Sequence, residues 1–341
     1  MTSFIPAVGL RNSHLQSILS STGPRKILEK FRSKVLIKKS QEHIINTPQG
    51  VKLLGSLTLF NQAYKENEKQ NSKGIAIIIH GWEGCSDSLY VLSSGQKLLD
   101  EGYDIFRLNL RDHGPSHHLN KALFNSSRLE EVAESVKYIC QQFGGEHNLL
   151  CGYSLGGNFC LRVANIAKQQ QIQIHQVIAI SPLLHPHSTM FELNNGLPIY
   201  EKYFVKKWKR SLNKKLKLHP EFDYAEKLKT LKSLDEMNEY FVLNQTEYTS
   251  TASYFDAYSI LGDGLKDLSI PATIITAKDD PMIPSIQLND LYHSQWLTID
   301  IQKYGGHCAF IKNWKFESWV SEYIVELANT FREKVISSKP A

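Results

Sequence analysis

The stretch CGYSLGG, residues 151–157, decides how the chain is organised. It contains the pattern Gly-x-Ser-x-Gly, follows a short predicted strand (148–151) and opens a predicted helix (155–169). A serine on such a sharp strand-to-helix turn is lifted clear of the sheet, and side chains at Gly152 and Gly156 would collide with the flanking elements. The helix N-terminus also favours negative charge that develops there. The stretch therefore predicts Ser154 as a nucleophile, with a Gly/Ser-rich turn without chemistry as the alternative.

Outward from this turn, strands and helices alternate at the spacing of βαβ units, which predicts a mainly parallel sheet with helices on both faces. The run GIAIII is continuously apolar, as expected of a strand buried on both faces. Strands are expected at 74–79, 104–109, 148–151, 176–180, 271–276 and 297–302, and helices at 87–101, 127–143, 155–169 and from about 313. The alternating residues 42–60 contain the turn TPQG and predict an edge hairpin, followed by a polar surface loop at 61–73.

The alternation stops over residues 183–268, where aromatic and basic helical segments replace strands. We expect a helical cap there, inserted between the sixth and seventh sheet strands and placed above an active site. The predicted core comprises residues 41–182 and 269–341. Residues 1–40 are expected to form an N-terminal arm that packs on the core and carries a short basic amphipathic stretch at 27–39.

A serine hydroxyl is a weak nucleophile and needs a base within hydrogen-bond reach, oriented in turn by an acid. The sequence YGGH follows the last predicted strand, and its two glycines are expected to form a flexible loop that brings His307 over the serine. The preceding strand ends in TAKDDPMIP, residues 276–284. Asp280, four residues before Pro284, is the expected acid. Asp279 stays the alternative, and the unused aspartate would cap the following turn.

The segment HGWEG, residues 80–84, follows the strand 74–79. A loop in this position donates one backbone N–H to a substrate oxygen, and the residue after the nucleophile donates the other. These rules predict an oxyanion hole made by the amides of Trp82 and Leu155. Gly81 would let the backbone approach a substrate closely. The Trp82 side chain belongs either to the core or to the pocket wall, and His80 is expected to be a hydrogen-bonded scaffold residue.

The composition limits the remaining classes of function. The 42% of hydrophobic and 21% of charged residues are ordinary for a globular chain, so wholesale disorder is not expected. A net charge of +5, without zinc-finger spacing or an RNA-reading motif, does not indicate nucleic-acid binding. The histidines of HPH at 185–187 and HH at 117–118 have no third ligand at a metal-site spacing, so neither a metal nor a cofactor is predicted.

The cysteines and the N-terminus indicate a compartment. Five scattered cysteines without metal-ligand spacing predict reduced thiols: Cys85, Cys140, Cys151, Cys160 and Cys308. The start MTSFIP lacks the basic region and apolar stretch of a secretory signal. We expect a cytoplasmic protein, with peripheral membrane contact left open.

Several of these segments together carry a resemblance to a known family. GLRNSHLQS at 9–17 resembles an N-terminal Arg-Asn-x-His-Leu-Gln-Thr element, with serine in place of threonine. The turn around Ser154, which we call the elbow, reads GYSLGGN at 152–158 and resembles the family's turn at this position, including the asparagine. With HGWEG, DDP at 279–281 and GGH at 305–307, the chain resembles the YheT-like α/β-hydrolases, a group related to eukaryotic abhydrolase proteins and yeast medium-chain ester synthases/esterases. The loop at 109–116, NLRDHGPS, departs from the family's usual Arg-Gly-x-x-Gly-Ser form.

The resemblance implies the α/β-hydrolase fold and hydrolysis of carboxylic esters, including acyl or lipid-like esters, by a Ser154–His307–Asp280 triad through an acyl-enzyme. The partner would then be a small-molecule ester. An acyltransferase that uses an alcohol as acceptor, or a non-catalytic binding module on the same scaffold, remains open.

The predicted cap also carries many lysines mixed with aromatic and aliphatic residues between positions 201 and 232. In one interpretation the lysines form a solvated face, while the apolar residues pack on the core or line an acyl pocket. In the other they make weak, electrostatic contact with an anionic membrane.

Overall fold

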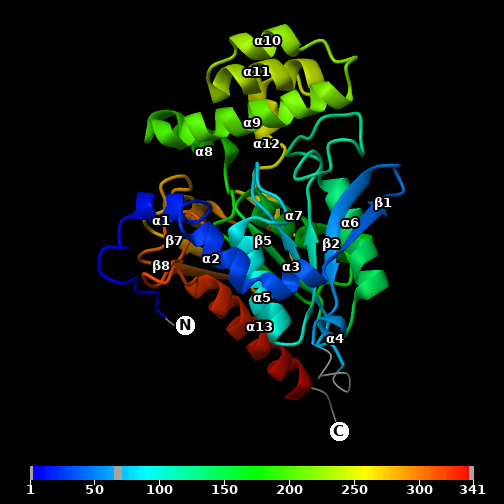
Figure 1. Ribbon diagram of the computed structural model, residues 1–341, viewed down its shortest axis with the longest axis vertical. Coiled ribbons are helices and arrows are strands. Elements are labelled where there is room, and N and C mark those ends of the chain that lie inside the picture. The colour runs from blue at the N-terminus through cyan, green and yellow to red at the C-terminus, as the bar shows by residue number, and fades with distance from the viewer. Residues whose placement is uncertain (1–2, 65–70, 338–341) are drawn as a thin grey trace.

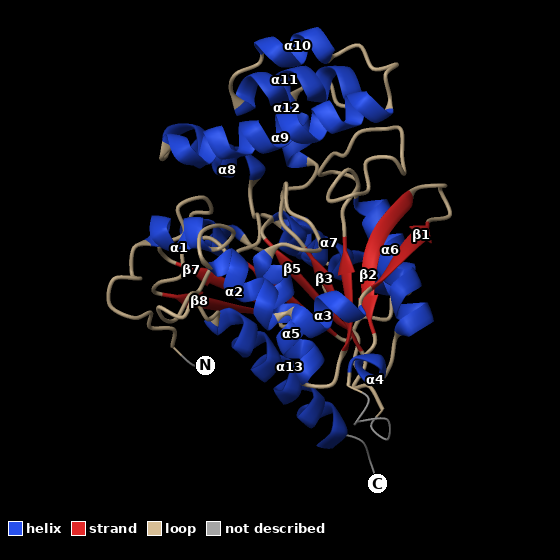
Figure 2. Ribbon diagram, viewed as in Figure 1, coloured by secondary structure: helices blue, strands red, loops and turns tan. Residues whose placement is uncertain are grey.

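The computed structural model describes residues 3–64 and 71–337. Its centre is an eight-stranded sheet in the order β1-β2-β4-β3-β5-β6-β7-β8 (Figure 2). The strands are β1 Gln41–Asn46, β2 Lys52–Thr58, β3 Ile75–Ile79, β4 Asp104–Leu108, β5 Leu149–Tyr153, β6 Gln176–Ile180, β7 Ala272–Ala277 and β8 Leu297–Gln302. The predicted edge hairpin is confirmed, because β1 and β2 pair antiparallel with β1 outermost. The contacts from β4 to β8 are all parallel.

Both faces of the sheet are covered by helices, as the apolar strands require. Along β3, Ile77 and Ile79 belong to one apolar cluster and Ile78 belongs to the other. The first cluster includes residues of α6 (Leu129–Phe143) and α7 (Leu155–Gln170), and the second includes residues of α5 (Leu89–Asp100) and α13 (Trp319–Ser337). Successive side chains of a strand point to opposite faces, so a continuous apolar run produces two cores.

The last helix begins later than its expected start near residue 313. Ile311 and Ser318 form an antiparallel bridge, and the backbone N–H of Lys312 donates to the carbonyl of Glu317 at 2.9 Å. This bridged turn uses backbone groups that a helix would need, so α13 begins only at Trp319.

The N-terminal arm is more structured than the single amphipathic stretch that the sequence predicts. It contains α1 (Ser13–Leu19), α2 (Arg25–Arg32) and α3 (Lys34–Lys39). Ser33 has a ψ of 22°, outside the helical range, and this residue separates α2 from α3. After β2 the short helix α4 spans Phe60–Ala63, and residues 65–70 of the predicted surface loop lie outside the described part of the chain.

Five helices lie between β6 and β7, and Figure 1 shows them above the carboxyl ends of the strands. They are α8 Pro186–Asn195, α9 Pro198–Leu218, α10 Ala225–Thr230, α11 Leu234–Gln245 and α12 Thr251–Asp256, and we refer to them as the cap helices. Short 3₁₀ helices follow at Asp263–Leu265 and Ser285–Asp290. Among the described residues, no helix is long and apolar enough to cross a bilayer.

A buried ion pair joins the cap helices to the core. Lys215 of α9 is only 1% exposed, and its Nζ donates to Asp112 Oδ1 at 2.7 Å and to the carbonyl of His117 at 3.2 Å. Removing one partner of such a pair would leave the other charge buried and unpaired. Lys215 therefore differs from the solvated lysines that the sequence predicts along this segment, since it faces the core.

The elbow depends on the absence of a side chain at Gly156. A Cβ at this position would lie 2.4 Å from the carbonyl oxygen of Ile79, a backbone atom that cannot move aside. We expect Gly156→Ala to lower the free energy of unfolding by about 3 kcal/mol, because overpacking a close-packed site commonly costs ~1–3 kcal/mol and the atom in the way here belongs to the backbone.

The control is Gly264→Ala, whose Cβ would lie 3.3 Å from its nearest neighbour, the carbonyl oxygen of Ser259. This control is expected to lose less than about 1 kcal/mol. Denaturant unfolding of both variants measures the difference, and equal losses would contradict the steric argument.

Candidate active site

Ser154 occupies the strained turn between β5 and α7. Its φ of 52° and ψ of −119° lie in a region that side-chain-bearing residues rarely adopt. A Cβ on Gly152 would lie 2.3 Å from the carbonyl oxygen of Gly156, so the first glycine of the motif is required for the same steric reason as the second. The glycines let the chain turn sharply enough to raise the serine hydroxyl above the carboxyl edge of the sheet.

The structure brings Ser154, His307 and Asp280 together although they are far apart in the sequence. The Nε2 atom of His307 lies 2.9 Å from Ser154 Oγ, and its Nδ1 atom lies 2.9 Å from Asp280 Oδ2. Both distances are those of hydrogen bonds. The three side chains thus form a continuous chain of hydrogen bonds from hydroxyl to imidazole to carboxylate.

The two neighbouring aspartates have different contacts. Asp280 has a side chain with no exposed surface, and its Oδ1 accepts hydrogen bonds from the backbone N–H groups of Met282 and Ile283 at 2.9 and 3.1 Å. Asp279 instead accepts from the backbone N–H of Gly306 at 2.9 Å. Asp280 therefore contacts the imidazole, while Asp279 holds the loop that carries it.

The electrostatics of the site favour a charged imidazole. Burial lowers the pKa of His307, but the Asp280 carboxylate beside Nδ1 and the neighbouring Cys308 together raise it by more, so the pKa lies well above its ordinary value. A proton taken up at Nε2 would therefore be stabilised by Asp280.

The loop that carries His307 is held by hydrogen bonds from its backbone to the arm and to the core. The backbone N–H of His307 donates to Ser17 Oγ at 2.8 Å, and the N–H of Cys308 donates to Ser181 Oγ at 3.3 Å. Gly306 has a φ of 55°, and a Cβ there would lie 2.5 Å from the carbonyl oxygen of Ser13. The glycine therefore allows the arm to pack closely on the loop.

The arm holds this loop through the element that carries the family resemblance. The Gln16 side chain donates to the carbonyl of Ile311 at 3.0 Å and accepts from the N–H of the same residue at 2.8 Å. His14 Nδ1 lies 2.9 Å from the Tyr200 hydroxyl of α9, so the same helix also contacts the cap. Sequence reasoning missed these positioning roles, and the Arg-Asn-x-His-Leu-Gln signature was the available signal.

The two amides predicted to form an oxyanion hole, those of Trp82 and Leu155, lie on the segments that flank Ser154. The N–H of Gly81 donates to the Tyr90 hydroxyl and the N–H of Glu83 donates to His113 Nε2, both at 3.1 Å. The amides of Trp82 and Leu155 donate to no other described residue. A Cβ on Gly81 would lie 3.1 Å from the Cβ of Ser154, so this loop runs directly beside the serine.

His80 has the scaffold contacts that the sequence predicts. Its Nδ1 lies 2.7 Å from the carbonyl of Gly81, and its Nε2 accepts from the N–H of Leu110 at 3.1 Å. Burial lowers its pKa well below the ordinary value, so the ring is neutral. It fixes the loop after β3 against the loop after β4.

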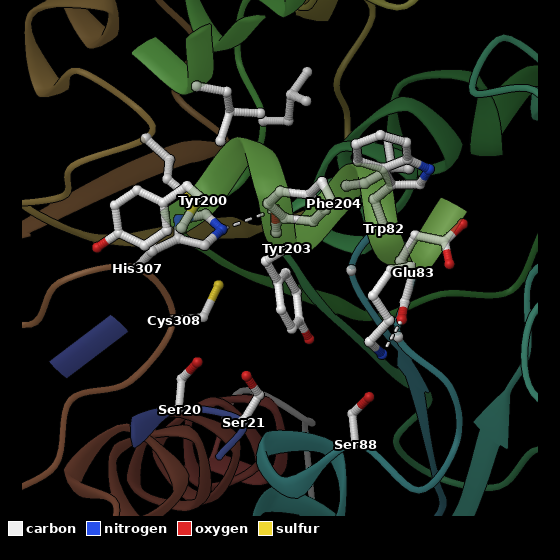
Figure 3. Close-up of a pocket in the computed structure, with 18 of the residues that line it drawn as sticks. Ser20, Ser21, Trp82, Glu83, Ser88, Tyr200, Tyr203, Phe204, His307 and Cys308 are labelled. Atoms are coloured by element: carbon white, nitrogen blue, oxygen red, sulfur yellow. Dashed lines mark hydrogen bonds between the residues drawn. The ribbon is translucent and has the colours of Figure 1, made fainter. Parts of the chain in front are cut away.

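A cavity of about 470 Å³ lies above Ser154 and His307. Its lining comes from the arm, the core and the cap helices, and Figure 3 shows Ser20 and Ser21 of the arm across it from Tyr200 and Phe204 of α9. The Trp82 ring stacks on Phe204 with centroids 5.0 Å apart, so Trp82 belongs to the pocket wall.

Glu83 also lies in this wall. Lys207 Nζ donates to its backbone carbonyl at 3.0 Å, and burial raises the pKa of its carboxyl to about 7. The wall beside the serine is thus less negative near neutral pH than the sequence implies.

The histidines at 117–118 and 185–187 each use one ring nitrogen in a contact with another part of the protein. His117 Nε2 lies 2.8 Å from Ser211 Oγ, and His187 Nε2 lies 3.1 Å from Asp256 Oδ1. His118 and His185 contact the carbonyl of Pro115 and the hydroxyl of Ser188. Within residues 3–64 and 71–337, no three His, Cys, Asp or Glu side chains gather as a metal site would require.

Comparison with known proteins places the chain in a family. Residues 77–313 match a protein family whose description is "alpha/beta hydrolase fold". The chain belongs to this family. The resemblance to YheT is confirmed over nearly the whole length: "Putative esterase YheT" of Escherichia coli is 23% identical over 97% of this chain and 94% of its own.

Two further similarities agree with this assignment. An "Abhydrolase domain-containing protein" of Dictyostelium discoideum is 21% identical over 96% of this chain and 81% of its own. The solved esterase Pf2001 of Pyrococcus furiosus superposes with a TM-score of 0.53 over 98% of this chain and 97% of its own, at 15% identity, and shares the fold.

The hydrogen bonds predict different effects for the two aspartates. We expect Asp280→Asn to lower turnover of an ester by about 10⁴-fold, because an amide at Oδ2 no longer holds the imidazole in the required tautomer. Asp279→Asn should lower it far less, since its contact is to a backbone N–H. Equal and mild losses of turnover in the two variants would show that another residue is the acid.

The pH profile gives an independent test of the same contact. The Asp280 carboxylate raises the pKa of His307, and a protonated imidazole cannot accept the serine proton. Activity should therefore rise with pH as His307 loses its proton. In Asp280→Asn the residual activity should rise at a lower pH, whereas Asp279→Asn should keep the wild-type midpoint. An unchanged midpoint in Asp280→Asn would contradict the assignment.

Proposed function

We propose that the chain is a serine hydrolase of carboxylic esters that works through an acyl-enzyme on Ser154. The observation that carries this proposal is the hydrogen-bonded series Ser154–His307–Asp280 on the floor of a largely apolar cavity. The likeness to proteins named as esterases supports the ester as substrate.

In the first half-reaction, Ser154 Oγ attacks the ester carbonyl while His307 Nε2 takes the hydroxyl proton. Asp280 accepts a hydrogen bond from Nδ1–H and stabilises the imidazolium. The tetrahedral oxyanion accepts hydrogen bonds from the amides of Trp82 and Leu155. The intermediate then collapses, the bond to the alcohol breaks, and His307 returns the proton to the departing oxygen.

In the second half-reaction, water replaces the alcohol. His307 Nε2 takes a proton from the water, the hydroxide attacks the acyl carbon, and the free acid leaves as Ser154 recovers its proton. These steps need no cofactor. Added ethanol distinguishes hydrolysis from transfer, because an ethyl ester in excess of free acid would assign an acyltransferase.

The cavity walls indicate which acyl groups fit. Rings and aliphatic chains from the cap helices and the core face the space above Ser154: Trp82, Leu193, Ile199, Phe204, Trp208 and Ile283. Apolar walls gain free energy by burying apolar substrate surface, at about 25 cal/mol per Å². We propose that the cavity accepts apolar acyl chains.

Replacing the nucleophile tests the chemistry. We expect Ser154→Ala to lower ester turnover by ~10⁴- to 10⁶-fold, because a triad without its hydroxyl cannot form the acyl-enzyme. The matched control is Ser21→Ala, another hydroxyl that lines the same cavity, and it should keep turnover within a few-fold of wild type. A folded Ser154→Ala protein that retains several per cent of activity would refute the assignment.

The chain-length dependence tests the cavity. With p-nitrophenyl esters from acetyl to octanoyl, kcat/KM should rise with length, because each added methylene buried in the apolar cavity contributes up to ~0.8 kcal/mol. The leaving group is the same throughout, so the trend reports the acyl site. A preference for acetyl would rule out the acyl-chain assignment.

A further inference from the structure

Helix α2, Arg25–Arg32, has its polar and apolar faces reversed with respect to the rest of the protein. The charged residues Arg25 and Glu29 are 0% and 3% exposed. Ile27 and Phe31 are 77% and 75% exposed. Successive residues of an α-helix are rotated by about 100°, so these two pairs lie on roughly opposite faces. The helix therefore buries one arginine and one glutamate while it presents Ile27 and Phe31 to the outside.

The buried face shows that this orientation is fixed by specific contacts. Arg25 donates to the carbonyl of Ser20 at 2.9 Å, while its Nε and the second terminal nitrogen have no partner in the structure. Burial lowers the pKa of this guanidinium. Burying a charge with incomplete pairing destabilises the fold. The exposed side chains of Ile27 and Phe31 gain no hydrophobic free energy that would offset this. Packing within the chain alone does not account for the arrangement.

The exposed apolar pair is surrounded by positive charge. Lys26 and Lys30 lie beside it on α2, and Lys34, Lys38 and Lys39 follow on α3. All five lysines are exposed, and none forms an ion pair with another described residue. An apolar helical face flanked by unpaired lysines is the pattern that binds the interface of an anionic bilayer.

The position of α2 connects this surface with the candidate active site. Lys26 and Lys30 line the cavity that contains Ser154. Across the cavity, the start of α9 contributes Ile199 and Tyr203, which are 51% and 37% exposed. Figure 1 shows α1 and α2 on the side of the core that faces α8 and α9. Apolar surface therefore flanks the cavity on both sides.

We propose that α2 docks the protein on an anionic lipid surface, with Ile27 and Phe31 inserted among the acyl chains and the lysines of α2 and α3 against lipid phosphates. The cavity would then open toward the bilayer, so that a lipid-borne ester reaches Ser154 without crossing water, a consequence that rests on the proposed esterase function. Uncompensated lysines around the apolar pair match anionic headgroups, which attract basic residues near the bilayer surface. The proposal places membrane contact on the arm, whereas one of the two interpretations of the sequence places it on the cap lysines.

The test is co-sedimentation of the full chain with phosphatidylcholine vesicles that contain or lack phosphatidylglycerol. Wild type should bind the anionic vesicles at low salt, and added salt should weaken binding because exposed charges are screened. Ile27→Ser/Phe31→Ser should bind about tenfold more weakly or worse. The matched control is Ile44→Ser/Leu243→Ser, which removes two apolar side chains that are 50% and 43% exposed and do not line the cavity.

Each outcome decides the proposal. Selective loss of vesicle binding in Ile27→Ser/Phe31→Ser, with unchanged circular dichroism, supports it. No wild-type binding, or equal binding by both double variants, overturns it. A wild-type dimer in sedimentation velocity that only Ile27→Ser/Phe31→Ser dissociates would assign the face to a second copy of the chain instead. Hydrolysis of soluble p-nitrophenyl octanoate, measured in parallel, separates the two claims: if it is absent the esterase proposal fails, whatever the vesicles show.

Discussion

The contact of α7 with the ends of β3 and β5 is the constraint on which the rest of the structure depends. It is made through Gly152 and Gly156, where any side chain would meet backbone atoms within 2.5 Å. This close approach forces Ser154 into a positive φ and sets its hydroxyl at the edge of the sheet. It also places the Leu155 amide at the open end of α7, where the helix dipole favours an oxyanion. The positions of Ser154 and of the first amide of α7 thus depend on the close approach of backbone at these two glycines.

A second requirement is a base that stays within reach of the serine. His307 stands on a loop that is tied to Asp279, Ser17 and Ser181 by backbone N–H groups. Since two of these partners belong to the core and one to the arm, the arm is part of the machinery that positions the base. Preorganisation of this kind reduces the reorganisation needed when charge develops on the imidazole. The same arm lines the cavity, so substrate access and base position are coupled through one segment.

Much of this could be predicted because the signals are local. Each signal lies within a few consecutive residues and can be interpreted without knowledge of tertiary contacts. These signals are the apolar runs of the strands, the serine between two glycines, and the segments DDP and GGH. What could not be predicted depends on tertiary contacts. The burial of Lys215 depends on its ion pair with Asp112 on a distant loop. The position of the loop that carries His307 depends on a hydrogen bond to Ser17 in the arm. The reversed orientation of α2 is visible only once Arg25 is seen to be buried, because its sequence alone fits either face.

The central claim is that Ser154 carries the acyl group during turnover. The most direct measurement is rapid acid quenching of the enzyme during hydrolysis of p-nitrophenyl octanoate, followed by peptide mapping by mass spectrometry. The account predicts an octanoyl adduct on the peptide that contains Ser154 and none in Ser154→Ala. An adduct on another residue, such as Cys308 beside the base, or turnover that continues in Ser154→Ala without any adduct, would contradict it.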